Sequence, residues 1–227
     1  MAKSTVISIG GSIVVPKNGI DVDYLKSFRD LLRPLVKSGG RFIVVVGGGH
    51  TARAYQQAAG AIVKLAPEDL DWLGIHATRL NGHLLRAIFR DLALHRVVKD
   101  PTRPVRWVEP IMIAAGWKPG WSTDYVAVRL AHKYKIKRVV NLTNIDAAYD
   151  KDPSRYDDAE PYDKIDWAAF RKLVGDKWSP GMNAPFDPIA SKLAQKWNME
   201  VTIAAGKDLK NLKNILTGRK FKGTTVG

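Results

Sequence analysis

Two glycine turns in this chain have the chemistry to hold anionic groups. Gly47, Gly48 and Gly49 follow an apolar run, and Arg53 stands one turn into the helical segment that comes next. Glycines let backbone N–H groups approach a phosphate closely, and the positive end of the helix dipole favours the same anion. An arginine at this spacing would add a charged clamp. The plainer alternative is a tight strand-to-helix turn that binds no ligand.

A second turn of this kind, Gly10-Gly11-Ser12, follows the N-terminal apolar stretch, and Ser122-Thr123-Asp124 is typical of a helix start. Polar turns also occur at Asn144-Ile145-Asp146 and Gly206-Lys207-Asp208. Several anion-binding turns suggest more than one phosphate subsite, provided that the fold brings them together. Two phosphate subsites in one site would favour phosphoryl transfer.

The elements that must position these turns are alternating strands and helices. Short apolar runs predict strands at Thr5–Ile9, Phe42–Val46, Ile111–Ala115, Arg138–Thr143 and Glu200–Ala204. Strands that alternate with helices predict an α/β fold, here a three-layer α/β/α sandwich around a central, mainly parallel sheet. Each turn described above follows the carboxyl end of a predicted strand, which is the edge where such sheets bind ligands.

Apolar residues at spacings of three and four predict two helices whose stripes pack in the core. The first stripe consists of Leu70, Leu73, Ala77, Leu80, Leu84 and Ile88, and the second of Val126, Leu130 and Tyr134.

The composition narrows the function further. A chain without cysteine has no disulfide, thiolate metal site or cysteine nucleophile. The net charge of +14 favours phosphorylated substrates. We weigh a solvated basic surface above a stable nucleic-acid site, because no nucleic-acid-binding motif accompanies the charge. No run of 18 apolar residues and no signal peptide is evident, so we expect a cytoplasmic protein without a membrane partner.

The familiar nucleotide-binding signatures are absent from the sequence. There is no Gly-x-x-x-x-Gly-Lys-Ser/Thr loop, and the His-Arg-Asp and Asp-Phe-Gly motifs of protein kinases are also missing. The turn at Gly47–Gly49 lacks the Gly-x-Gly-x-x-Gly pattern of dinucleotide-binding folds. A kinase of either common architecture and a nicotinamide dehydrogenase are therefore disfavoured.

Six segments nevertheless occur in a characteristic order and spacing: 9–12, 46–53, 73–81, 119–124, 141–153 and 186–192. On these motifs, the chain resembles the amino acid kinase superfamily over nearly its whole length, and within it the archaeal-type UMP kinases. The resemblance implies one domain over 1–227, with an acceptor-binding part at about 1–137 and an ATP-binding part at about 138–227. It also implies a homo-oligomer, since related UMP kinases form hexamers.

The resemblance further implies a role for each matching residue. Catalysis would involve Gly11, Ser12, Arg53, Asp124 and Lys192. ATP would be bound by Gly11, Ser12, Gly49, Arg53, Thr143, Asn144, Tyr149 and Asp152. UMP would be bound by Gly48, Asp71, Trp117, Lys118, Pro119, Gly120, Trp121, Ser122 and Thr123. Mg²⁺ would accompany ATP, and no protein ligand for a metal is expected.

Plainer roles and departures from the family stand beside these expectations. Asp124 could be only a first-turn helix residue, and Lys192 only an exposed one. Many family members carry a lysine where this chain has Ser8, and Lys3 and Lys17 are candidate substitutes for the missing cation. In the acceptor loop, residues 117–121, Trp117 and Trp121 stand where related sequences usually have smaller or polar residues. The identity of the acceptor is therefore less well specified than the kinase chemistry.

The hypothesis favoured by the sequence is transfer of the γ-phosphoryl group of Mg-ATP to UMP, giving UDP and ADP for pyrimidine nucleotide synthesis. A superfamily kinase for another small acceptor, such as an isoprenoid phosphate or a carboxylate, is the alternative enzyme. A noncatalytic nucleotide- or oxyanion-binding homologue is the alternative from another class, because one expected cation is missing.

Overall fold

The computed structural model describes residues 4–153, 155–177 and 184–227, and its centre is a seven-stranded sheet. The strands are β1 (Ser4–Ile9), β2 (Arg41–Val46), β3 (Ile111–Ala114), β4 (Arg138–Thr143), β5 (Lys164–Ile165), β6 (Glu200–Ala205) and β7 (Thr224–Val226). The five strands predicted from the sequence are confirmed as β1, β2, β3, β4 and β6. The short β5 and β7 were not predicted.

The strand order across the sheet is β3-β2-β1-β4-β6-β7-β5. All neighbours among β3, β2, β1, β4 and β6 are parallel, and only β7 runs antiparallel to its neighbour β6. The carboxyl ends of the parallel strands therefore lie along one edge, and the mainly parallel sheet is confirmed.

Eight helices occur in the described part of the chain. They are α1 (Gly11–Val14), α2 (Val22–Lys37), α3 (Gly49–Gly60), α4 (Pro67–Ile88), α5 (Thr123–Lys133), α6 (Trp167–Val174), α7 (Pro188–Lys196) and α8 (Leu209–Thr217). Several begin at a polar cap that satisfies an otherwise free backbone N–H group. The Ser122 hydroxyl accepts from Tyr125 N at α5, and the Asp187 carboxylate accepts from Ala190 N at α7.

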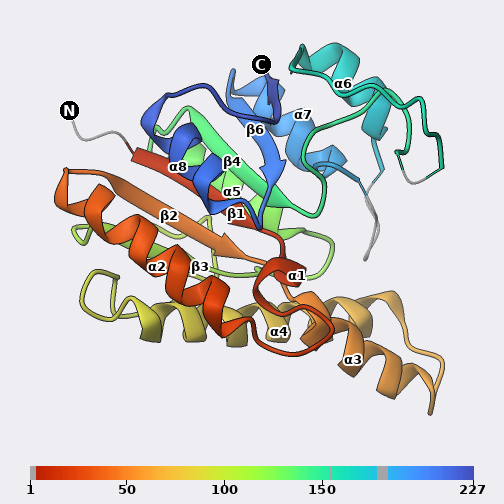
Figure 1. Ribbon diagram of the computed structural model, residues 1–227. Coiled ribbons are helices and arrows are strands. Elements are labelled where there is room, and N and C mark those ends of the chain that lie inside the picture. The colour runs from red at the N-terminus through yellow and green to blue at the C-terminus, as the bar shows by residue number, and fades with distance from the viewer. Residues whose placement is uncertain (1–3, 154, 178–183) are drawn as a thin grey trace.

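Helices cover both faces of the sheet, which makes the expected three-layer sandwich. In Figure 1, α2 and α8 cross in front of the strands and α5 lies behind them. One core joins α1, α2, α8 and the end of α4 to the sheet, and the other joins α5, α6 and α7 to the opposite face. Val6 and Ile7, which are successive residues of β1, are both fully buried because they face different cores.

The apolar stripe predicted on α4 was partly wrong. Leu80 is 63% exposed, whereas Thr78, Asn81 and Gly82 on the same helix are buried. Polar and small residues occupy the inner face of α4 because that face holds two loops of the candidate site, as described below. The stripe predicted on α5 is confirmed at Val126 and Leu130.

None of the helices in the described ranges is long and apolar enough to cross a membrane.

Candidate active site

The two glycine turns meet at the carboxyl edge of the sheet. Gly11 begins α1 after β1, and Gly49 begins α3 after β2. Gly49 has a φ of +63°, and a Cβ on it would lie 2.3 Å from the Gly11 carbonyl oxygen. Only residues without side chains allow the two turns to approach this closely. The N-terminal ends of α1 and α3 are thereby brought to one place, and His50 N of α3 donates to Val15 O, the residue that follows α1.

Asn81 holds the second turn from the side of α4. Its Nδ2 group donates to the carbonyl oxygens of Gly47 at 2.9 Å and Gly48 at 3.1 Å, and the residue is 3% exposed. The Gly47 N–H group donates to Ile9 O at 2.9 Å, so this turn is also tied to β1. Asn81 and Ile9 thus fix the shape of this turn from two sides.

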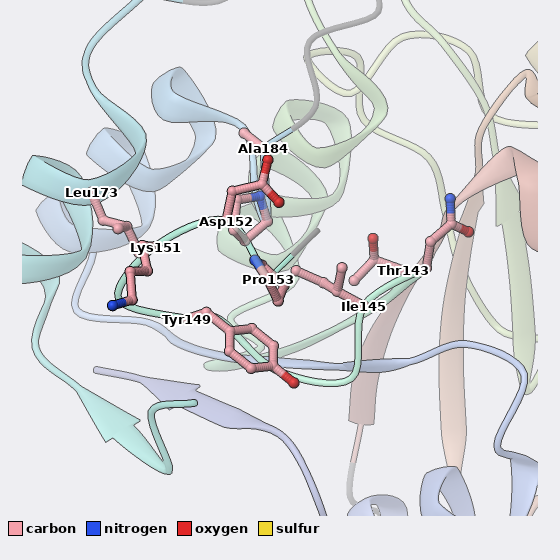
Figure 2. Close-up of a pocket in the computed structure, with 10 residues that line it drawn as sticks. Thr143, Ile145, Tyr149, Lys151, Asp152, Pro153, Leu173 and Ala184 are labelled. Atoms are coloured by element: carbon pink, nitrogen blue, oxygen red, sulfur yellow. The ribbon is translucent and has the colours of Figure 1, made fainter. Parts of the chain in front are cut away.

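One cavity of about 210 Å³ opens beyond the end of β4. It is lined by Thr143, Asn144, Ile145, Tyr149, Lys151, Asp152, Pro153, Leu173, Ala184 and Pro185. Figure 2 shows the side chains of Thr143, Ile145, Tyr149 and Asp152 around the segment that follows β4. Four of the residues that the sequence assigned to ATP, namely Thr143, Asn144, Tyr149 and Asp152, come together here.

Polar contacts fix two sides of this cavity, which we call the donor cavity. The Ser12 hydroxyl donates to Asn144 Oδ1 at 2.9 Å, linking the first glycine turn to the end of β4. The Tyr149 hydroxyl donates to Asp146 Oδ1 at 2.7 Å, and Lys222 Nζ lies 2.6 Å from Asp146 Oδ2. The hydrogen bond from Lys222 holds the pKa of the Asp146 carboxyl below its usual value, and the hydrogen bond from Tyr149 adds to the shift. Sequence reasoning missed Lys222 because it belongs to a basic C-terminal cluster without a motif.

A second cavity of about 230 Å³ lies between α3, α4 and the start of α5. It is lined by Gly48, Gly49, Ala52, Arg53, Gln56, Leu70, Asp71, Gly74, Ile75, Thr78, Gly116, Trp121, Ser122 and Thr123. Five of the residues that the sequence assigned to UMP are among them: Gly48, Asp71, Trp121, Ser122 and Thr123. We call this space the acceptor cavity. Gln56 was not predicted, and it is fixed by donating to Leu70 O at 2.8 Å.

The loop between β3 and α5 is fastened to α4 at several points. The Thr78 hydroxyl accepts from Gly116 N at 2.8 Å, and Arg79 donates to Trp117 O at 2.7 Å. Asp71 Oδ2 accepts from Gly120 N at 2.6 Å. These contacts explain why the inner face of α4 is polar, since the helix supports the glycine turn and the acceptor loop together.

The residues predicted at the acceptor loop separate into two groups. Trp121, Ser122 and Thr123 line the acceptor cavity, whereas Trp117, Lys118, Pro119 and Gly120 do not. The Trp121 and Tyr125 rings lie 4.0 Å apart between centroids, and the Trp117 ring lies 6.0 Å from that of Trp121. Trp121 is therefore a cavity wall supported by other aromatic rings.

Asp124 lies in the first turn of α5, directly after Thr123 of the acceptor cavity. Its Oδ1 atom accepts from the Ser8 hydroxyl at 2.8 Å, and its Oδ2 atom accepts from Asp187 N at 3.3 Å. Burial raises the pKa of the Asp124 carboxyl to about 6; the nearby Asp187 carboxylate also raises it, while the Ser8 hydrogen bond lowers it. Burial likewise raises the pKa of Asp187, whose carboxyl group caps α7.

Among the predicted cationic residues that the structure describes, only Arg53 lines one of the two cavities. Arg53 lines the acceptor cavity, although the sequence assigned it to the ATP side. Lys192 is exposed on α7, and the pKa of the Asp176 carboxyl is lowered mainly by its hydrogen bond from Arg171, with a smaller contribution from the charge of Lys192. Lys17 is exposed after α1, and Lys3 lies outside the described residues. In the ranges that the structure describes, no group of three or more His, Cys, Asp or Glu side chains could hold a metal ion.

Comparison with known proteins decides the family. The sequence profile of the amino acid kinase family matches residues 3–205. The chain belongs to this family. A uridylate kinase of Thermoplasma volcanium is 33% identical over 235 aligned positions, which cover 100% of this chain and 98% of the relative. A uridylate kinase of Thermococcus kodakarensis is 34% identical and covers 97% of this chain and 98% of its own length.

Solved structures agree with the amino acid kinase fold. The crystal structure of uridylate kinase from Archaeoglobus fulgidus matches with a TM-score of 0.82 at 26% identity, covering 98% of this chain and 99% of that protein. The UMP kinase of Bacillus anthracis matches with a TM-score of 0.80 at 17% identity, covering 99% of this chain and 96% of that one. The second likeness concerns the fold alone. The resemblance expected from the sequence and the three-layer fold are both confirmed.

Proposed function

We propose that this member of the amino acid kinase family is a UMP kinase, which transfers the γ-phosphoryl group of Mg-ATP to UMP and gives UDP and ADP. The observation that carries the proposal is the attachment of each cavity to one of the two interlocked glycine turns: Gly49 lines the acceptor cavity, and Ser12, next to Gly11, donates to Asn144 of the donor cavity. The relatives that match nearly the whole chain are named uridylate kinase, and this name supports UMP as the acceptor. The alternative of another small acceptor is not favoured by these relatives.

The acceptor cavity is the proposed site of UMP. Arg53 is the cation of that cavity and would bind the UMP phosphate, with help from the first-turn N–H groups of α3. Trp121 would lie against the base or sugar as an apolar wall. Asp71, Ser122 and Thr123 offer polar groups from the opposite sides of the same space. The residues outside the cavity, including Trp117 and Lys118, would shape the loop and not contact UMP.

The donor cavity is the proposed site of ATP. Thr143, Asn144, Tyr149 and Asp152 line it, and Ser12 of α1 is hydrogen-bonded to Asn144 at its edge. Mg²⁺ would enter this cavity as part of the substrate Mg-ATP. When bound, the ion would neutralise charge on the phosphates. This division supports an acceptor-binding part at 1–137 and an ATP-binding part at 138–227.

Phosphoryl transfer of this kind needs alignment and charge neutralisation more than covalent chemistry from the protein. The acceptor phosphate is already ionised, so no general base is required. Asp124 is hydrogen-bonded to Ser8 and to the backbone of Asp187, and it would orient groups around the transferred phosphoryl group. Lys192 stays a predicted catalytic residue, which would have to turn toward the site from its exposed position on α7.

The test is ADP production from Mg-ATP with a panel of acceptors: UMP, CMP, AMP, GMP, isopentenyl phosphate and acetylglutamate. Turnover largely confined to UMP, with UDP identified by phosphorus NMR, is the expected result. Turnover with isopentenyl phosphate or acetylglutamate in its place would overturn the acceptor. ATP binding without turnover of any acceptor would make the chain a noncatalytic nucleotide-binding homologue.

We further propose a homo-oligomer, up to a hexamer. Leu80 and Trp72 on α4 are 63% and 37% exposed, and Ile62 after α3 is 83% exposed. A contact between subunits would cover these apolar side chains. Light scattering after size-exclusion chromatography should give a multimer that Leu80→Asp reduces in mass, whereas a monomeric wild-type protein would contradict the proposal. The cytoplasmic location and the absence of a nucleic-acid partner stay predictions.

A further inference from the structure

Two polar side chains lie buried side by side in the apolar sheet. Ser8 of β1 is 2% exposed, Asn141 of β4 is 4% exposed, and the two are Cα partners in the parallel ladder. They belong to the same alternation as Val6 and Val139, which face the core that contains α5. Buried parallel strands are normally continuous apolar runs, so two polar neighbours at this point need a structural reason.

The reason is a set of hydrogen bonds to two separate segments. Ser8 Oγ donates to Asp124 Oδ1 at 2.8 Å, and Asn141 Nδ2 donates to Pro185 O at 2.8 Å. The two segments are also joined to each other, because Asp187 N donates to Asp124 Oδ2 at 3.3 Å. The Asp124 carboxylate thus connects β1, the start of α5 and the segment before α7. Asn141 ties β4 to the same segment.

This carboxylate joins the walls of the two cavities. Thr123, the residue before Asp124, lines the acceptor cavity. Pro185, two residues before Asp187, lines the donor cavity. A change in the position of the Asp124 carboxylate would therefore alter the spacing between the two walls. Transfer between two bound phosphates is sensitive to that spacing, and an error of about 1 Å can cost about 100-fold in rate.

We propose that Ser8 is a positioning residue, which fixes the Asp124 carboxylate to the sheet and so keeps the acceptor wall at Thr123 and the donor wall at Pro185 in register. This inference rests on the proposed function, since it assigns UMP and ATP to the two cavities. Ser8 does not line either cavity and acts only through Asp124. Its hydroxyl does by a hydrogen bond what a charged side chain at the same place could do by an ion pair.

The test compares Ser8→Ala with Thr202→Val. Thr202 is a fully buried hydroxyl residue of β6 whose Oγ1 has no hydrogen-bond partner among the described residues, so its replacement controls for the loss of a buried strand hydroxyl. Ser8→Ala should lower kcat about tenfold, because a hydrogen bond to a charged group is lost, while KM for each nucleotide stays within about twofold. Thr202→Val should leave kcat and KM within about twofold of wild type. Equal kcat for wild type and Ser8→Ala would overturn the proposal.

The pH dependence separates positioning from general damage to the fold. The acceptor phosphate itself titrates at about pH 6, but that limb of the kcat profile is the same for every variant. The charged group that faces Asp124 is Asp187, and the Ser8 hydrogen bond lowers the pKa of Asp124. Ser8→Ala should therefore shift an acidic limb of the kcat–pH profile to higher pH, and Thr202→Val should not. A limb that does not move in Ser8→Ala would contradict the inference.

An NMR measurement keeps this test independent of the proposed function. The carboxyl carbon of Asp124, assigned by its loss in Asp124→Asn, reports the pKa of that group without any substrate. A higher pKa in Ser8→Ala than in wild type would establish the contact even in a protein that fails to phosphorylate UMP. An unchanged pKa would overturn the contact, and with it the positioning role, whatever the acceptor is.

Discussion

A Cβ atom on Gly11 would lie 2.0 Å from the backbone nitrogen of Gly49, although the two residues follow different strands of the sheet. The obstacle is backbone, which cannot turn aside as a flexible side chain could. The turns of α1 and α3 are therefore one structural unit. Both N–H arrays are held at a fixed separation, and this separation determines where two phosphate groups could be bound.

Gly11→Ala should abolish catalysis, because the added methyl group would push the two turns apart. A displacement of about 1 Å between the turns would lower kcat/KM by about 100-fold or more. Gly60→Ala is the matched control, since Gly60 ends α3 and a Cβ there meets no atom within 4 Å. The control should keep full activity and be neutral or stabilising by up to about 1 kcal/mol. Retained activity in Gly11→Ala would contradict the proposed arrangement of the turns.

Arg53→Met should weaken the binding of UMP and leave the binding of ATP unchanged, because Arg53 lines the acceptor cavity. Loss of a charged hydrogen bond to phosphate predicts an increase of about tenfold or more in KM for UMP, with KM for ATP within about twofold. Arg90→Met, at an exposed arginine that lines neither cavity, is the control. Steady-state kinetics with each nucleotide varied in turn provides the measurement. A rise in KM for ATP alone would return Arg53 to the ATP side, as the sequence first indicated.

Asp124→Asn should stabilise the fold at neutral pH while removing activity. The pKa of Asp124 is about 6 in the folded protein, above its value of about 3.9 in an unfolded chain. A raised pKa means that this group's contribution to stability is complete below about pH 4 and is lost as the pH rises through about 6. Asparagine does not ionise and avoids that loss.

Urea denaturation at several pH values checks this expectation. The free energy of unfolding of Asp124→Asn should exceed that of wild type by about 2 kcal/mol at pH ~8, and the difference should vanish near pH ~4. Equal free energies of unfolding for the two proteins at every pH would show that burial does not raise the pKa of the Asp124 carboxyl.

Lys222→Met should raise KM for ATP by about threefold, because Lys222 holds Asp146 and Asp146 orients Tyr149 at the donor cavity. The contact is exposed, so the effect should shrink at high salt. Lys220→Met removes another exposed lysine of the same segment and should change neither nucleotide's KM. An identical effect of the two substitutions would indicate only the loss of general positive charge.

The sequence was sufficient for the strands that carry the site, because buried parallel strands leave clear apolar runs. It missed β5 and β7, which have two and three residues and are too short for any periodicity. It also misplaced the inner face of α4. The residues buried there, such as Thr78 and Asn81, are polar because they hold loops that are distant in sequence, and an apolar pattern cannot reveal such contacts.

The candidate site was predicted well where residues follow strands directly and less well elsewhere. Thr143 and Asn144 continue β4 and lie at the donor cavity as expected. The direction of the Arg53 side chain depends on how α3 packs against α4, which the spacing of residues along the chain does not specify. Ser8 lies inside a predicted strand, and its contact with Asp124 joins positions separated by 116 residues.

The proposed boundary between an acceptor-binding and an ATP-binding part runs through the sheet between β1 and β4, which form a parallel ladder from Val6–Val139 to Ile9–Leu142. The two parts therefore have no seam along which they could separate. If either part were produced alone, it would present an unpaired and largely apolar strand edge, and such edges recruit other chains. We expect separately expressed halves to aggregate, and the enzyme to admit and release nucleotides by movement of rim loops over a sheet that stays closed.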